Sequence, residues 1–300
     1  MAEIRRIAAE DLDGLVPLVA AARAAGEFHA SSDPEGAYFL DSFRYSPAPA
    51  VAAFAPDGSV LGLASGEFKL VLVRPDMRRH GIGTALVTAA AAVERERGRA
   101  SILMGTLPGD AAGEAFLRAT GFAHHSTVWD LSLSADMPAA TPVWPIGVVA
   151  RPFSRAQDLR VWAELHNTAF ADHPTPMEVN LETLETAPAD PAVDDLDTLL
   201  AVDEATGAVV GFCSTFADRH DGVAGSDAEV WAIGVAPDRQ GRGIGRQLLR
   251  WGILRLRSQG VAEVRLSVNT RNEGAVGLYL REGFAPWRTR ERWARPVLPG

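Results

Sequence analysis

The chain has 300 residues, enough for two domains, and 47% of them are hydrophobic, which is ample for two buried cores. A net charge of −9 argues against nucleic acid as a partner, because phosphate binding needs clustered basic side chains, and it favours a cationic, amine-bearing substrate. The sequence has no run of about 18 apolar residues, so we expect no membrane partner. Its first 15 residues carry acidic side chains where a signal peptide would be apolar, so we expect no secretion. The single cysteine, Cys213, is compatible with a cytoplasmic location.

The first half of the chain predicts a unit in which strands and helices alternate. Pro56, Asp57 and Gly58 separate two short runs, which is the pattern of a β-hairpin. Residues 134–147 hold three prolines among small residues, and this composition indicates a linker. Before it we expect, in chain order, strand 4–7, helix 10–25, strands 51–54, 59–64 and 67–73, helix 82–97, strand 101–105, helix 111–119 and a strand near 128–133.

The second half predicts the same order of elements. Residues 172–197 carry eight acidic side chains and neither lysine nor arginine, which indicates a solvated lid or an electrostatic guide for cationic amines. Arg288, Arg290 and Arg292 alternate along the last strand and predict one exposed face. We expect strand 148–151, helix 156–170, a helical patch near 177–186, strands 198–202 and 209–216, a polar loop over 217–227, strand 229–235, a helix to 258, strand 264–269, a helix after 272 and an antiparallel pair of strands after 283.

The stretch 229–258 predicts a strand, a glycine-rich turn and a helix. Apolar residues recur at 248, 249, 253 and 256, the spacing of one buried helical face. The first N–H groups of a helix have no internal partner, and the helix dipole adds positive charge there. Glycines at 241, 243 and 245 let a phosphate approach the main chain without meeting a Cβ atom. The sequence therefore predicts an anion site at this turn.

Two common phosphate-binding motifs do not fit this turn. The P-loop requires Gly-Lys-Ser/Thr, and Lys69, the only lysine of the chain, lies far from it in the sequence. The dinucleotide fingerprint requires a third glycine three residues after its second, where this chain has Arg246 or Leu248. The turn is therefore of another type.

The pattern that fits is Val-x-Pro-x-x-Gln-x-x-Gly-x-Gly, which begins at Val235 and resembles the acyl-CoA pyrophosphate loop of the GNAT superfamily of N-acetyltransferases. Residues 272–284 are similar to that family's second signature, Asn-x-x-Ala-x-x-Leu-Tyr-x-x-x-Gly-Phe. The resemblance implies an α/β fold with a splayed mixed β-sheet flanked by helices. It also implies acetyl-CoA as cosubstrate without a metal, and direct attack by a primary amine of a small molecule in a ternary complex.

An internal repeat relates the two halves. The segment 73–83 matches 235–245 at an offset of 162 residues, and the match continues without gaps to Gly121 over Gly283. The same offset places Leu117 under Tyr279. We interpret residues 1–133 as a degenerate GNAT domain, 134–147 as a linker and 148–300 as the catalytic GNAT domain. The first copy offers a candidate second CoA site made of Val73, Arg78, Gly81 and Gly83.

The resemblance implies roles for residues of the second copy. Glu229, eleven residues before Gln240, is the candidate general base acting through water, and Tyr279 is the candidate general acid at the CoA sulfur. Asn272 is a candidate N-cap that also contacts the pantetheine arm. The cofactor-binding candidates are Ile233, Gly234, Val235, Gln240, Gly241, Arg242, Gly243, Ile244, Gly245, Arg246, Asn272 and Ala275.

The acceptor side is expected at the first helices of the second copy and at the loop 217–227. His166, Phe170 and His173 are the candidate substrate residues, in a segment similar to one of the mycothiol synthases, which are tandem GNAT proteins with the active copy second. Residues 267–271, however, are those of general acetyltransferases. A simple amine and the cysteinyl amine of a pseudodisaccharide therefore both stay open, as does a CoA-binding module without turnover.

Overall fold

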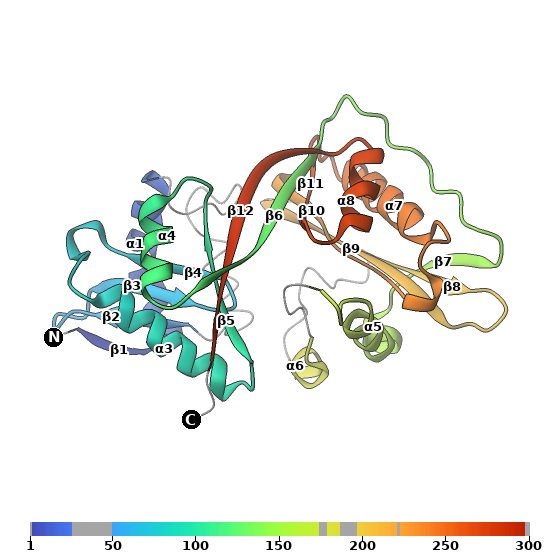
Figure 1. Cartoon of the computed structure of the whole chain (residues 1–300). Coiled ribbons are helices and arrows are strands. Elements are labelled where there is room, and N and C mark those ends of the chain that lie inside the picture. Colours follow the sequence, from blue (N-terminus) through green and yellow to red (C-terminus); the bar gives the residue numbers. More distant parts are fainter. Residues whose placement is uncertain (1, 26–49, 174–178, 187–196, 221–222, 298–300) are drawn as a thin grey trace. The chain divides into compact units, whose positions relative to one another are not determined.

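The computed structural model describes residues 2–25, 50–173, 179–186, 197–220 and 223–297, which form two compact units (Figure 1). Unit 1 contains Met1–Val128 and Thr289–Gly300, and unit 2 contains Trp129–Arg288. Two strands, β6 (Ala123–Leu133) and β12 (Ala285–Pro296), therefore begin in one unit and end in the other. Within the described ranges, no helix is both long and apolar enough to cross a membrane.

Unit 1 is built on an antiparallel sheet with the order β1-β2-β3-β4. Leu15 and Val19 of α1 belong to the buried cluster that contains Leu63, whereas Leu86 of α3 belongs to the cluster that contains Ala64, the next strand residue, so the two helices cover opposite faces. The elements are β1 (Glu3–Arg6), α1 (Leu12–Ala24), β2 (Val51–Phe54), β3 (Val60–Ser65), β4 (Leu70–Val73), α3 (Ile82–Glu96), β5 (Ser101–Thr106) and α4 (Ala111–Ala119), with short 3-10 turns at Ala9–Asp11 and Pro75–Met77.

Unit 2 repeats this plan around the strand order β7-β8-β9-β10-β11, in which only β10 and β11 are parallel. Trp162 of α5 packs in a buried cluster with Phe212 of β9, and Leu248 of α7 packs in the cluster of the other face with Cys213. The elements are β7 (Val148–Pro152), α5 (Arg155–Ala169), α6 (Leu181–Thr186), β8 (Thr198–Asp203), β9 (Val209–His220), β10 (Val223–Val235), the 3-10 turn η4 (Pro237–Arg239), α7 (Ile244–Ser258), β11 (Val264–Asn269) and α8 (Glu273–Arg281).

The two strands that cross between units complete the core of the unit in which they end. Leu131 and Leu133 of β6 are buried in the cluster of unit 2. Trp293 of β12 is 2% exposed in the core of unit 1, where β12 pairs antiparallel with β5 and the indole N–H donates to the Thr106 hydroxyl at 2.9 Å. The compact units therefore differ from the predicted ranges 1–133 and 148–300, because the last strand packs with the first unit.

Most expected elements are present to within a few residues, but three predictions are wrong. Within the expected polar loop 217–227, residues 217–220 and 223–227 are instead the ends of β9 and β10, with Ala228 in register with Ala217 and Val223 with His220, because main-chain ladders form without apolar side chains. The expected pair of strands after Gly283 is the single strand β12. Arg288 is not on an exposed face, since its side chain is 14% exposed and pairs with Asp130. Most of the acidic run 172–197 lies outside the described residues.

The packing of Trp293 generates the first prediction. We expect Trp293→Ala to lower the free energy of unfolding of unit 1 by about 3–5 kcal/mol, the usual cost of truncating a buried tryptophan. Amide hydrogen exchange should accelerate in α3 and β5 of unit 1 and stay unchanged in α7 of unit 2. Trp287→Ala is the matched control on the same strand, because Trp287 is 42% exposed. Faster exchange confined to unit 2 would contradict the assignment of this strand to unit 1.

Candidate active site

The central strands of unit 2 diverge at Glu229. Within the described residues, the register between β10 and β11 consists of one pair, Glu229 with Arg265. Beyond that pair β10 continues alongside β9 to Val235, with a register shift between Val230 and Ala232. The two parallel strands therefore form a wedge, the opening between β10 and β11 after Glu229, and the main chain of 233–235 lies along one side of it. Such an edge offers hydrogen-bonding groups that a ligand can use.

The glycine turn at the open end of the wedge is free of side chains. Gly243 is the N-cap of α7 in the left-handed conformation, with φ 86° and ψ −5°. A Cβ atom at Gly241 or Gly243 would meet nothing within 4 Å, and one at Gly245 would make ordinary contacts with Val235 at 3.7 Å and Leu278 at 3.9 Å. Ile244, 2% exposed, anchors the turn in the core. The first amides of α7 are therefore not covered by side chains of the turn, which is the arrangement that an anion site requires.

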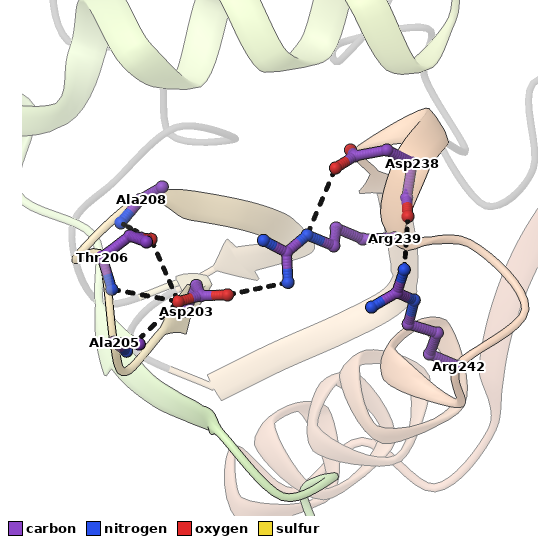
Figure 2. A network of polar contacts seen from close by, with 7 residues as sticks. All are labelled: Asp203, Ala205, Thr206, Ala208, Asp238, Arg239 and Arg242. Atoms are coloured by element: carbon purple, nitrogen blue, oxygen red, sulfur yellow. Dashed lines mark hydrogen bonds and ion pairs between the residues drawn. The ribbon is translucent and has the colours of Figure 1, made fainter.

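Two side-chain contacts hold this turn against the sheet. The Gln240 amide donates to the carbonyl oxygen of Val235 at 3.2 Å, which ties the turn to the end of β10. Arg239 pairs with Asp203 at 2.7 Å, in the turn between β8 and β9 (Figure 2). Asp203 also accepts the N–H and hydroxyl of Thr206 at 3.0 Å, and these bonds, followed by the Arg239 charge, hold the pKa of its carboxyl below the ordinary value. These contacts brace the turn against the ends of β8 and β10.

The two arginines that flank the turn are engaged with the protein. The Arg242 guanidinium donates to the main-chain oxygen of Asp238 at 3.1 Å, which keeps it beside the turn (Figure 2). Arg246 pairs with Glu282, the C-cap of α8, at 3.0 Å, and Arg250 shares that carboxylate at 2.8 Å. Arg246 thus links α7 to α8.

Asn272 caps α8 as predicted. Its side-chain oxygen accepts the N–H of Ala275 at 3.1 Å, which satisfies one free donor at the start of the helix. The cap fixes the beginning of α8 directly after β11, and so fixes the position of Tyr279 two turns further along.

Tyr279 packs against the core cluster of β9, β10 and α7, with its ring 6.1 Å from that of Phe284. Burial raises the pKa of its phenol, and Cys213 raises it further, so the hydroxyl stays protonated at neutral pH. Burial likewise raises the pKa of the Cys213 thiol, which is therefore unreactive. The arrangement supplies a proton donor and no nucleophilic thiolate.

Glu229 and the expected acceptor residues lie on the other face of these strands from α7. Glu229 is half-buried at the last paired position before the wedge opens, opposite Phe216 on β9 and Arg265 on β11. Two residues later, the Trp231 ring lies nearly parallel to the His166 ring, with centroids 6.4 Å apart. An aromatic cluster therefore begins next to the candidate base.

The structure brings the three predicted substrate residues together in this cluster. The ring centroids of His166 and Phe170 are 4.7 Å apart, and His173 meets Phe170 edge-on at 5.7 Å. His166 is 1% exposed, and burial lowers its pKa to about 4. Among the described residues, neither ring nitrogen of His166 nor the indole nitrogen of Trp162, whose ring is 5.3 Å away, has a hydrogen-bond partner. The cluster thus holds neutral polar atoms in an apolar setting.

The same glycine turn is present in unit 1. Gly81 caps α3 with φ 80°, and a Cβ atom there would meet nothing within 4 Å. Arg78 donates to the carbonyl oxygen of Val73 at 3.1 Å, the contact that Gln240 makes in unit 2. Gly83 is tighter than its counterpart, because a Cβ atom would lie 3.2 Å from the Phe116 ring. Leu117, 1% exposed, occupies the position of the tyrosine.

The tether between Arg239 and Asp203 and the aromatic partner Trp231 did not emerge from the sequence. The pattern Asp203-x-x-Thr206-Gly207 predicts a turn that the aspartate closes with its own side chain. Its ion pair with a residue 36 positions later has no local signal. Trp231 does have a local sequence signal, since it follows Glu229 by two residues and so lies on the same face of the strand.

Comparison with known proteins shows that this chain is similar to GNAT acetyltransferases. The model of the acetyltransferase (GNAT) family matches residues 20–122 and 160–284. A mycothiol acetyltransferase of Thermobispora bispora is 33% identical over 93% of this chain and 90% of its own, and one of Salinispora arenicola is 32% identical over 98% and 97%. Two solved structures share the fold. One is a GCN5-related N-acetyltransferase of Sphaerobacter thermophilus, with a TM-score of 0.69 and 24% identity over 100% of this chain and 96% of its own. The other is a tandem GNAT protein from the clavulanic acid biosynthesis pathway, with a TM-score of 0.69 and 19% identity over the whole of both chains.

The chain belongs to the GNAT family of acetyltransferases and is an N-acetyltransferase with two GNAT domains. The family uses acetyl-CoA and acts on small molecules. Among the described residues no group of histidine, cysteine and carboxylate side chains could hold a metal ion.

The burial of His166 generates the second prediction. Because its pKa is lower in the folded protein than in the unfolded chain, unfolding takes up a proton between about pH 4 and pH 6.5, so stability is complete above this window and falls as the pH drops through it. Between pH 7.5 and pH 4.5, the free energy of unfolding should therefore fall by about 2–3 kcal/mol less in His166→Phe than in the wild-type protein. Urea unfolding at both pH values measures this difference. The exposed His80→Phe is the control and should keep the wild-type pH dependence.

Proposed function

We propose that unit 2 transfers the acetyl group of acetyl-CoA to a primary amine of a small molecule by direct attack in a ternary complex. The observation that carries the proposal is the wedge between β10 and β11, which joins the open glycine turn to Glu229. Six residues of strand separate Val235 from Glu229, about 20 Å of extended chain. An elongated cosubstrate can therefore be held at one end and react near the other.

The glycine turn holds the pyrophosphate in this proposal. The main-chain amides of 241–245 donate to the phosphate oxygens, the positive end of α7 favours their charge, and Arg242 lies beside them. The edge of β10 formed by Ile233, Gly234 and Val235 pairs with the amides of the pantetheine arm, as a neighbouring strand would. Asn272 and Ala275 border the arm on the side of α8. Binding thus uses main-chain groups that the fold leaves available.

Acetyl transfer then requires three catalytic functions from the protein: a base, stabilisation of the charge on the thioester oxygen, and an acid. Glu229 accepts the amine proton through water, so that the amine attacks in its neutral form. A main-chain N–H of the wedge stabilises the thioester oxygen as it gains charge. The C–N bond forms, the C–S bond breaks, and Tyr279, whose hydroxyl is protonated at neutral pH, donates its proton to the departing sulfur.

We infer that the acceptor approaches along the aromatic cluster. His166, Phe170 and His173 line up toward Trp231, which adjoins Glu229 on β10. The second candidate substrate is the cysteinyl amine of a pseudodisaccharide, which the mycothiol acetyltransferase relatives favour.

The test is release of the CoA thiol in the presence of a panel of primary amines, with the cysteinyl pseudodisaccharide amine beside simple mono- and diamines. Turnover with one of them supports acetyl transfer and identifies the acceptor class. Acetyl-CoA binding without turnover on any amine of the panel would favour a CoA-binding module and overturn the proposal. A product that carries the acetyl group on oxygen or sulfur would overturn its chemistry.

The position of Tyr279 generates the third prediction. With a productive acceptor, we expect Tyr279→Phe to lower kcat by about 10²–10⁴-fold, the usual contribution of a general acid. The affinity for acetyl-CoA, measured by calorimetry, should stay unchanged, because the phenylalanine ring keeps the packing. An unaltered kcat would show that the departing sulfur takes its proton from another source.

The position of Glu229 generates the fourth prediction. We expect Glu229→Gln to lower kcat/KM at pH 7 by about 10²-fold, and the loss to shrink as the pH rises, because a larger fraction of the amine is then already neutral. Glu67→Gln is the matched control, since Glu67 holds the corresponding position in unit 1. Rates and pH profiles should be measured with both variants. A loss that is equal at every pH would remove Glu229 from the role of base.

A further inference from the structure

Lys69, the only lysine of the chain, lies at the point where the central strands of unit 1 separate. Its carbonyl oxygen accepts the N–H of Gly105 at 2.7 Å, which joins the chain just before β4 to β5. From there β4 continues in the four-stranded sheet and β5 pairs with β12 instead. Lys69 has a left-handed backbone, with φ 58°, which is uncommon for a residue with a side chain. It therefore stands at the narrow end of the wedge of unit 1, the opening between β4 and β5.

The position of Lys69 corresponds to the reacting end of the site in unit 2. The offset of 162 residues places it on Trp231, two residues after the candidate base. Four residues of chain, about 13 Å, separate it from Val73, where the glycine turn of unit 1 begins. That turn keeps an open left-handed glycine, Gly81, at the start of α3. An acetyl-CoA bound there would extend its thioester toward Lys69.

The surroundings of Lys69 favour its neutral amine. The side chain is half-buried, and its amine donates to the carbonyl oxygen of Glu67 at 3.0 Å. The carboxylates of Glu67 and Glu94 raise the pKa of the Lys69 ammonium, but both also pair with Arg97, at 3.1 and 3.2 Å, and Arg290 and Arg292 of β12 lower that pKa. Burial first, and the charge of Arg292 second, lower the pKa of the Lys69 ammonium to about 8. At pH 8 about half of the amine is neutral, against less than about one part in a hundred for an ordinary lysine.

We propose that Lys69 is an acetyl acceptor for the cosubstrate held by its own unit. The Lys69 amine nitrogen attacks the thioester carbonyl, the C–N amide bond forms and the C–S bond breaks. CoA leaves as the thiol with the proton that the nitrogen releases. The inference rests on the proposed function only in that acetyl-CoA is the donor. Because the product amide stays attached to the chain, the reaction occurs once per molecule and removes one positive charge beside Arg290 and Arg292.

The experiment incubates the full-length protein with isotopically labelled acetyl-CoA and measures intact mass and the labelled peptide. We expect one acetyl group on Lys69, added at a rate that rises with pH and levels off above about pH 8. Lys69→Arg should take up no label at this peptide. The chain unfolded in urea at the same pH should be labelled at least about tenfold more slowly, because its lysine has an ordinary pKa.

Matched glycine variants assign the reaction to one unit. Gly81→Val, which fills the open turn of unit 1, should abolish labelling of Lys69, whereas Gly243→Val, the same change in unit 2, should leave it intact. Excess unlabelled CoA, which competes for the turn without carrying an acetyl group, should slow the labelling of the wild-type protein if Gly81→Val does not fold. Labelling that survives Gly81→Val, or that needs Gly243, would overturn the proposal.

The two proposals fail separately. Labelling of Lys69 without turnover on any amine would contradict the proposed function alone. Turnover on an amine with an unlabelled Lys69 would contradict the self-acetylation alone.

Discussion

One backbone conformation sets the arrangement of each unit: a left-handed glycine immediately before the helix that follows the central strand. Gly243 adopts it before α7 and Gly81 before α3. A residue with a Cβ atom would be strained there and would cover the first amides of the helix. The strand can therefore end and the helix begin within a few residues, so that the end of the wedge and the positive end of the helix coincide. The proposed pyrophosphate site depends on this coincidence.

Both units have this left-handed glycine turn, and they differ in the side chains around it. Arg78 and Gln240 span the turn in the same way, and Asp110 and Asn272 cap the next helix through the same main-chain position. The groups that chemistry would use have changed, since Leu117 replaces the tyrosine of unit 2. The two units thus share the main-chain geometry of the turn and of the helix cap, while the side chains that the chemistry would need differ between them.

Local patterns predicted most of the fold, because caps, glycine turns and apolar spacing act within a few residues. The helix 111–119 and the strand 264–269 have the predicted bounds, and Asn272 caps as predicted. What the sequence could not predict joins residues far apart. The partner of Arg288 lies 158 positions earlier, and the core that receives Trp293 belongs to the first unit. The roles of Glu229 and Tyr279 stay predictions, since they depend on ligands as well as on the fold.

The path of β12 has a consequence for biosynthesis. Trp293 and its neighbours are synthesised after all of unit 2, yet they fill the interior of unit 1, which is made earlier. Multidomain chains usually fold from the amino terminus during translation. Here unit 1 stays incomplete until unit 2 has been synthesised and β12 follows it. While unit 2 is being made, the apolar surface that Trp293 covers in the folded protein therefore stays exposed.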